Sequence, residues 1–156
     1  MFDGITRKLK LFISYSHEDE QLKNHLDKHL IMLKRSGKVE VWNDRQLIAG
    51  QEWDSGIKKE MLEADIILLL ISADFNNSEY IWKEELAAAM ERHEQGTARV
   101  VPVILRKCEW NEMPYAKLQA LPKGARPVTE FPDKDDAFTD IASGIRLLVD
   151  NMLLKK

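Results

Sequence analysis

Short apolar runs alternate along this chain with longer segments in which apolar residues recur every three or four positions. The runs that predict strands are residues 9–14, 39–42, 66–71, 99–105 and, more weakly, 126–129. The segments whose period predicts helices are residues 17–36, 53–64, 79–93 and 135–154. Strands that alternate with helices predict an α/β fold, in which a parallel sheet is covered by helices on both faces.

The order of these elements predicts a flavodoxin-like three-layer fold with five parallel strands in the order 2-1-3-4-5. Residues 66–71 are apolar throughout, which is typical of a buried central strand, whereas Pro102 lacks an amide donor, so its strand is expected to lie near an edge or to be locally irregular. Strands one and three are neighbours whose connections leave in opposite directions, and ligands bind at the carboxyl ends of such strands. The expected site therefore includes the segments 14–16 and 72–75 and the helix that Ser78 can cap.

Length and composition fit one cytosolic domain. The 156 residues suit a single core, and the net charge of −3 argues against a nucleic-acid partner. Cys108 is the only cysteine, so no internal disulfide can form. The longest apolar run, residues 66–71, is far shorter than the roughly 20 residues that span a bilayer, so we expect no membrane partner.

Two adjacent carboxylates in the helix 79–93 differ in the face they occupy. At about 100° per residue, Trp82, Leu86 and Ala89 form one apolar stripe, and Glu85 lies roughly 60° from its centre. Glu84 points to the opposite side and is expected in solvent. A carboxylate beside a buried face either pairs with a basic group, such as Lys83 or Arg92, or belongs to a functional site. Helical geometry leaves both interpretations of Glu85 open.

Other chemistry finds less support in the sequence. There is no glycine-rich phosphate loop of the G-x-G-x-x-G or P-loop kind. His25 and His29 are one helical turn apart, but no third ligand is expected near them, so no metal is predicted. A phosphoacceptor receiver domain would need an aspartate that ends strand three, where this chain has Ile71-Ser72, and helix capping accounts for Asp19.

Four segments, in order, resemble Toll/interleukin-1 receptor (TIR) domains, particularly prokaryotic ones. They are Leu11-Phe12-Ile13-Ser14-Tyr15-Ser16, the loop from Trp42 to Trp53, Ser78-Glu79-Tyr80 with Glu85-Leu86, and the stretch from Arg92 to Arg106. The loop has Ala49-Gly50 where many members have Pro-Gly. Many members also carry a tryptophan four residues before the glutamate, and this chain has Ile81 there, between Tyr80 and Trp82.

The resemblance implies an NAD+ glycohydrolase that cleaves the bond between nicotinamide and ribose, with Glu85 as the catalytic residue. NAD+ is then the substrate and no cofactor is expected. Family members commonly act in antiphage defence or NAD depletion and are activated by homotypic TIR–TIR association. The alternative is a non-catalytic TIR interaction module. Residues 1–156 would be one TIR domain with a core of about 8–154, the amino-terminal module of a longer protein with a fused sensor domain.

The remaining site residues are assigned by the strand ends and by the resemblance together. We expect Ser14 and Tyr15 to line the nucleotide cleft, with Ser72 at the end of strand three. Phe75 is expected either to cover a substrate ring or to pack in the core. Trp82 is expected either to stack on nicotinamide or to pack in the core, and its place on the apolar stripe favours the core. Asp44 and Arg45 belong to the loop after strand two, where the guanidinium group can meet a phosphate or take part in assembly.

Overall fold

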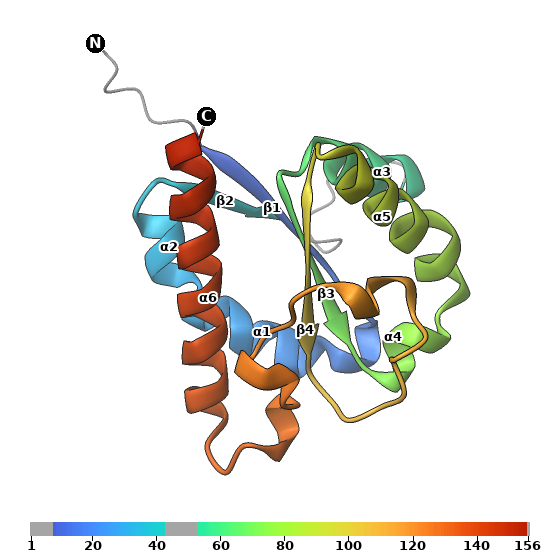
Figure 1. Cartoon of the computed structure of the whole chain (residues 1–156), viewed down its shortest axis with the longest axis vertical. Helices are drawn as coiled ribbons and strands as arrows, with labels where there is room; N and C mark the ends of the chain where they lie inside the picture. Colours follow the sequence, from blue (N-terminus) through green and yellow to red (C-terminus); the bar gives the residue numbers. More distant parts are fainter. Residues whose placement is uncertain (1–7, 43–52, 156) are drawn as a thin grey trace.

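The computed structural model of the chain describes residues 8–42 and 53–155 (Figure 1). The strands are β1 (Leu9–Ser14), β2 (Val39–Trp42), β3 (Ile66–Ile71) and β4 (Arg99–Ile104). The α-helices are α1 (Glu20–His29), α2 (Ile31–Arg35), α3 (Trp53–Glu63), α4 (Ala73–Asn77), α5 (Ala87–Gln95) and α6 (Lys134–Lys155). The shorter helical segments are η1 (His17–Asp19), η3 (Ile81–Leu86), η4 (Pro114–Lys117), η5 (Lys123–Ala125) and η6 (Val128–Glu130).

The four strands form one parallel sheet in the order β2-β1-β3-β4. All six residues of β3 are buried, which confirms the central strand expected from its apolar sequence. Side chains of a strand alternate between its two faces, and β3 divides accordingly. Ile66, Leu68 and Leu70 belong to one core cluster, and Ile67, Leu69 and Ile71 belong to the other.

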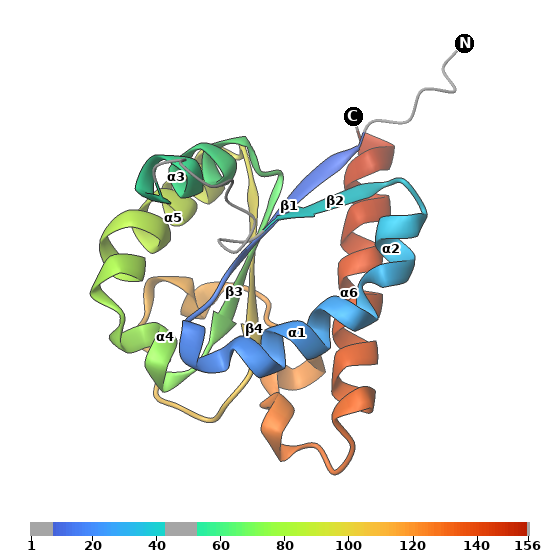
Figure 2. The same cartoon turned by 180° about the vertical axis from the view of Figure 1, so that it is seen from behind.

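Helices cover both faces of this sheet, as the alternating pattern predicted. Figures 1 and 2 show α1, α2 and α6 on one side of the sheet and α3, α4 and α5 on the other. Leu26, Phe138 and Ile141 fill the first core, and Met61, Phe75 and Ala89 contribute to the second. The single helix expected over residues 17–36 is divided between η1, α1 and α2.

The fifth strand expected at residues 126–129 is wrong: within the described residues the sheet has four strands. Proline explains the difference, because four of the five prolines, at positions 114, 122, 127 and 132, fall in the segment after β4. Proline cannot donate to a strand ladder and favours turns. Residues 128–130 instead form the 3-10 turn η6, and only Leu121 bridges to β4, opposite Val103.

β4 is therefore an edge strand, as Pro102 indicated. The carbonyl of Pro102 accepts a hydrogen bond from the Leu121 amide at 2.9 Å, and the amide of Ile104 donates to the Leu121 carbonyl at 2.8 Å. Since both bonds leave β4 on the side away from β3, Pro102 lacks its donor on the outer side of the sheet, where a missing donor breaks no ladder.

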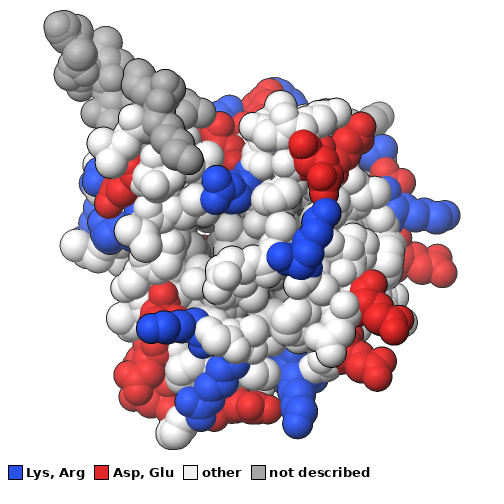
Figure 3. Space-filling model, viewed as in Figure 1, with Lys and Arg blue, Asp and Glu red and all other residues white. Residues whose placement is uncertain are grey.

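The surface is of mixed charge. On the face shown in Figure 3, basic and acidic side chains are interspersed and form no basic stripe of the kind that binds nucleic acid. Among the described residues, none of the helices has the length and apolar character required to cross a membrane.

Candidate functional site

The helical segment that carries Glu85 is π-helical, and this changes which side chains face the core. In a π-helix the hydrogen bonds run from residue i to i+5, so each turn holds more residues than an α-helical turn. Over η3 the buried side chains are Ile81, Glu85 and Leu86, whereas Trp82 is 42% exposed. The expectation that Trp82 packs in the core is therefore wrong, and Glu85 lies deeper than the α-helical projection suggested.

Glu85 lines a cleft just beyond the carboxyl end of β1, one of the two strand ends at which the strand order predicted a ligand site. The cleft has a volume of about 270 Å³ and is lined by Tyr15, Ser16, His17, Glu18, Ser78, Tyr80, Ile81 and Glu85. Tyr80 precedes Glu85 by five residues, which the π-helical turn brings to one side of the segment. Of the two aromatic residues that flank Ile81, Tyr80 lines the cleft and Trp82 does not.

Glu85 is held at the base of this cleft by the end of β1. Its side chain is only 5% exposed, and its Oε1 accepts a hydrogen bond from the Ser14 hydroxyl at 2.5 Å. Hydrogen bonds to an ionised acceptor are shorter and stronger than neutral ones. Tyr15, the next residue, is buried, and the ammonium group of Lys23 lies 5.2 Å from its ring centroid. Ser14, Tyr15 and Glu85 thus come together; Tyr15 lines the cleft, whereas Ser14, which was expected there too, is buried and is not among the lining residues.

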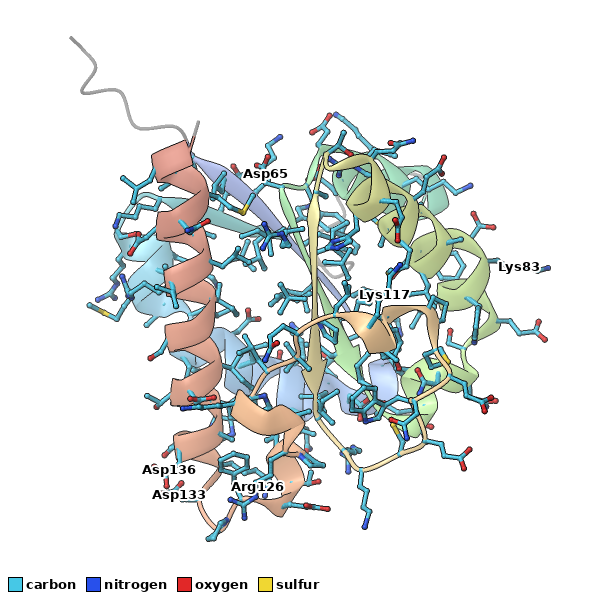
Figure 4. All side chains as sticks on the ribbon, viewed as in Figure 1. Asp65, Lys83, Lys117, Arg126, Asp133 and Asp136 are labelled. Carbon is cyan, nitrogen blue, oxygen red and sulfur yellow. The ribbon has the colours of Figure 1, made fainter. Side chains whose placement is uncertain are left out.

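The neighbouring charged groups have other partners than Glu85. Glu84 forms an ion pair with Lys58 at 2.8 Å on the surface. Arg92 donates to the carbonyls of Met61 and Ala64 at 2.8 and 2.6 Å. Lys83 is exposed and points away from the domain (Figure 4). These positions argue against the interpretation in which Glu85 is a surface carboxylate paired with Lys83 or Arg92.

A second buried carboxylate, that of Asp19, lies next to the cleft and forms hydrogen bonds between the segments that follow β1, β3 and β4. Its side chain accepts hydrogen bonds from the Ser72 hydroxyl, which follows β3, and from Nε of Arg106, which follows β4, the latter at 2.8 Å. Ser72 also accepts from the amide of Phe75 at 3.0 Å and so caps α4. Ser16 caps the helical turn that contains Asp19, through the bond from the Glu18 amide to its hydroxyl at 3.3 Å, but helix capping does not account for the Asp19 carboxylate, which binds Ser72 and Arg106.

Two other candidates, Phe75 and Trp82, are not among the residues that line the cleft. Phe75 is fully buried, with its ring centroid 6.5 Å from that of Tyr115 in an edge-to-face arrangement. Burial raises the pKa of the Tyr115 hydroxyl, which donates to Asn76 at 2.7 Å. The indole of Trp82 donates to the Asn76 carbonyl at 2.8 Å, so α4 holds it at the surface. Asp44 and Arg45 lie outside the described residues.

A larger cavity of about 750 Å³ lies between β4 and α6, lined among others by Val100, Leu121 and Leu148. It extends to Gly96 and Arg99, at the start of β4. In open α/β sheets ligands bind at the carboxyl ends of the strands, and this cavity reaches the opposite end. The smaller cleft, with its buried carboxylate, is the stronger candidate.

Sequence reasoning missed Tyr80, His17 and the Asp19–Arg106 pair as parts of this region. Asp19 and Arg106 are 87 residues apart, so their contact depends on the tertiary fold. Tyr80 was hidden by the α-helical projection, which places a residue five positions before Glu85 off its face. Only the strand-end rule could have indicated His17, because it follows β1 within three residues.

Comparison with known proteins gives a consistent family. A family model described as "TIR domain" matches residues 11–141. The uncharacterized protein y4lF of Sinorhizobium fredii (strain NBRC 101917 / NGR234) is 47% identical over 136 residues. That match covers 87% of this chain and 42% of y4lF, so the chain spans less than half the length of this relative.

Solved structures of TIR domains share the fold. The TIR domains of the activated Roq1 resistosome, which directly recognizes the pathogen effector XopQ, match with a TM-score of 0.67 and 18% identity, covering 88% of this chain and 99% of that one. The TIR domain of the Toll-related receptor TRR-2 from Hydra magnipapillata gives 0.51 at 20% identity, with 67% and 80% covered. A prokaryotic SEFIR domain gives 0.52 at 18%, with 87% and 91% covered.

Proposed function

Because the chain belongs to the TIR domain family, we propose that it is an NAD+ glycohydrolase with Glu85 as its catalytic residue. The observation that carries the proposal is a carboxylate only 5% exposed that nevertheless borders a cleft just beyond the carboxyl end of β1. A buried carboxylate costs free energy unless it is compensated, and such groups gather at functional sites.

The chemistry suits a site with one such carboxylate. The nicotinamide ring of NAD+ carries a positive charge and leaves as a neutral molecule, because the electrons of the ribose–nitrogen bond return to the ring nitrogen. No general acid is needed. The developing positive charge on the ribose is stabilised by the Glu85 carboxylate, as carboxylates stabilise oxocarbenium-like transition states in glycosidases. Attack by water, with release of a proton, gives ADP-ribose, and attack by the adenine ring gives a cyclic product.

Ser14 and Tyr80 have supporting roles in this proposal. Ser14 holds the Glu85 carboxylate through the 2.5 Å hydrogen bond and so fixes one of its oxygens. Tyr80 lines the cleft and offers an aromatic face to the cationic nicotinamide ring, an attractive arrangement for a cation. Tyr15 and Ser16 line the same cleft and are the proposed neighbours of the ribose.

Self-association is the proposed means of activation. A cleft of about 270 Å³ is smaller than the roughly 300–1,000 Å³ typical of small-molecule sites, so it suits the nicotinamide riboside end of NAD+ better than the whole dinucleotide. A neighbouring copy would then enclose the remainder of the substrate. The TIR domains of the Roq1 resistosome are part of an assembly, which supports this idea.

A purely associative role is the second candidate. Large apolar side chains are exposed on several helices, among them Met32, Leu62 and Leu147. Exposed apolar groups favour protein–protein contacts when they cluster. In this role the domain would assemble with other TIR domains and would not cleave NAD+, although it contains Glu85.

The deciding experiment measures nicotinamide release from NAD+ by chromatography over a wide range of protein concentrations. Wild type, Glu85→Gln and Glu84→Gln are compared, because the adjacent Glu84 provides a matched loss of one carboxylate outside the cleft. We expect release that rises more than linearly with protein concentration, disappears in Glu85→Gln and persists in Glu84→Gln.

Light scattering on the same samples separates the two candidates. Release that survives Glu85→Gln would refute the catalytic role of Glu85. Assembly without release in the wild type, at every concentration, would favour the associative role.

A further inference from the structure

Two histidines of α1 and an aspartate of α6 form a compact group at the surface. Nε2 of His25 and Nε2 of His29 each lie 3.0 Å from the same oxygen, Oδ1 of Asp135. The two histidines are four residues apart on one helix, whereas Asp135 is distant from both in the sequence. The expectation that no third metal-ligating group lies near the histidines is therefore wrong.

The spacing of these three side chains matches the coordination sphere of a small divalent ion. Zinc binds histidine nitrogen and carboxylate oxygen at about 2.0–2.1 Å, so ligand atoms at the corners of a tetrahedron are about 3.3–3.4 Å apart. The two N···O separations are 3.0 Å, and the three ligand atoms all lie within 4.8 Å of one another. Small rotations of the three side chains would bring these atoms into position.

The packing around the group holds the rings in place. The His25 and His29 rings lie 4.6 and 5.8 Å from the ring of Phe138, which is fully buried. Asp135 is anchored through its amide, which donates to the Asp133 carboxylate at 2.9 Å. Because these side chains are already partly ordered, binding of an ion loses less side-chain conformational entropy.

The charges at this end of α6 also favour a cation. Asp133 and Asp136 flank the same turn and lie together at the start of the helix (Figure 4). They add negative potential next to the three ligands. Asp135 itself is exposed, with 65% of its side chain accessible, so an ion can approach from solvent.

We propose that His25, His29 and Asp135 bind a divalent transition-metal ion, with zinc as the best match to the donor set. Imidazole nitrogen with carboxylate oxygen suits zinc, and three protein ligands leave one position for water. Bound there, the ion joins α1 to α6, which lie on the same face of the sheet (Figure 1). The site is independent of the proposed NAD+ chemistry at Glu85.

Calorimetric titration of the whole chain with zinc chloride, after removal of metal, tests the proposal directly. We expect one equivalent to bind, and we expect His25→Ala, His29→Ala and Asp135→Asn each to weaken binding at least tenfold. The matched controls are Asp150→Asn, which removes a carboxylate near the other end of α6, and His93→Gln, which removes a histidine outside the group. Both should bind zinc within about twofold of wild type.

Two further measurements keep the test decisive if an alanine variant folds poorly. Cobalt(II) in a tetrahedral site absorbs visible light far more strongly than the hydrated ion, so wild type should show such bands and Asp135→Asn, a change at an exposed side chain, should lose them. Zinc at about 100 times its dissociation constant should raise the Tm of wild type by roughly 5 °C or more. No saturable binding at millimolar zinc, or equal binding by wild type and all three variants, would overturn the proposal and leave a simple hydrogen-bonded His–Asp–His group.

Discussion

Replacing Arg106 with alanine should destabilise the domain more than replacing its partner Asp19. The Asp19 side chain is fully buried, whereas the Arg106 side chain is 48% exposed. Loss of Arg106 leaves a buried carboxylate with less compensation, whereas loss of Asp19 leaves a guanidinium group that can turn toward water. The two halves of one ion pair therefore have unequal consequences.

The expected magnitudes follow from this difference in burial. Breaking a buried pair by removing one partner costs about 3–5 kcal/mol, and the partial exposure of Arg106 lowers the expectation for Arg106→Ala to about 2–3 kcal/mol. Asp19→Ala removes the acceptor of the Ser72 hydroxyl, and an unsatisfied buried donor costs about 1–2 kcal/mol. The double variant contains no buried charge at this position, so it should resemble Asp19→Ala and be about 1 kcal/mol more stable than Arg106→Ala.

Urea denaturation at pH 7 measures all three variants, and the double-mutant cycle gives the coupling between the two side chains. Lys117→Ala is a suitable control, because it breaks the exposed pair between Lys117 and Glu94 and should leave the urea midpoint unchanged. A double variant less stable than Arg106→Ala, or an Arg106→Ala midpoint equal to that of the control, would refute the reasoning.

Three further predictions concern single side chains. Ser14→Ala removes the hydrogen bond to Glu85, which is worth about 1.5–3 kcal/mol for a charged acceptor. The kcat for nicotinamide release should therefore fall roughly 10- to 100-fold, with less change in KM, and an unchanged kcat would exclude the positioning role of Ser14. Gly96→Ala should lower the free energy of unfolding, measured by urea denaturation, by about 1 kcal/mol, because Gly96 ends α5 at φ +77°. No atom lies within 4 Å of the position that the alanine methyl group would take, so the loss comes from the backbone conformation alone. Gly96→Asn should lower the free energy of unfolding less. Burial, and secondarily the charge of Asp19, raises the pKa of Cys108, so less thiolate is present at a given pH. The midpoint of iodoacetamide alkylation should lie at higher pH than that of a free cysteine peptide measured alongside, and an equal or lower midpoint would contradict the raised pKa.

The strands and the location of the site follow from sequence patterns because those patterns are local. The continuous apolar run of β3 required burial on both faces, and the order of elements placed Ser14 and Tyr15 at the switch point. The prediction of a fifth strand was wrong for an equally local reason. It considered only the apolar content of the segment, whereas Pro127 removes a backbone donor from it.

The contacts that the sequence did not predict depend on helical phase or on tertiary packing. A projection at 100° per residue placed Trp82 in the core. In the π-helical turn Trp82 lies at the surface and Glu85 is buried more deeply than the projection indicated. The pairing of Asp19 with Arg106 joins residues distant in the chain. Nothing in the periodicity of one helix indicates what another helix places beside it, and for that reason the sequence did not indicate Asp135 as a neighbour of His25 and His29.

The closed edge of β4 limits how copies of this domain can join. Along its outer side, the amide of Val100 donates to the His93 ring at 3.2 Å, Pro102 has no amide hydrogen, and the amide of Ile104 is bonded to Leu121. An incoming strand would find each of these three donors occupied or missing. Copies that assemble therefore cannot extend the sheet by pairing a strand with β4, and contacts at this edge must form between side chains.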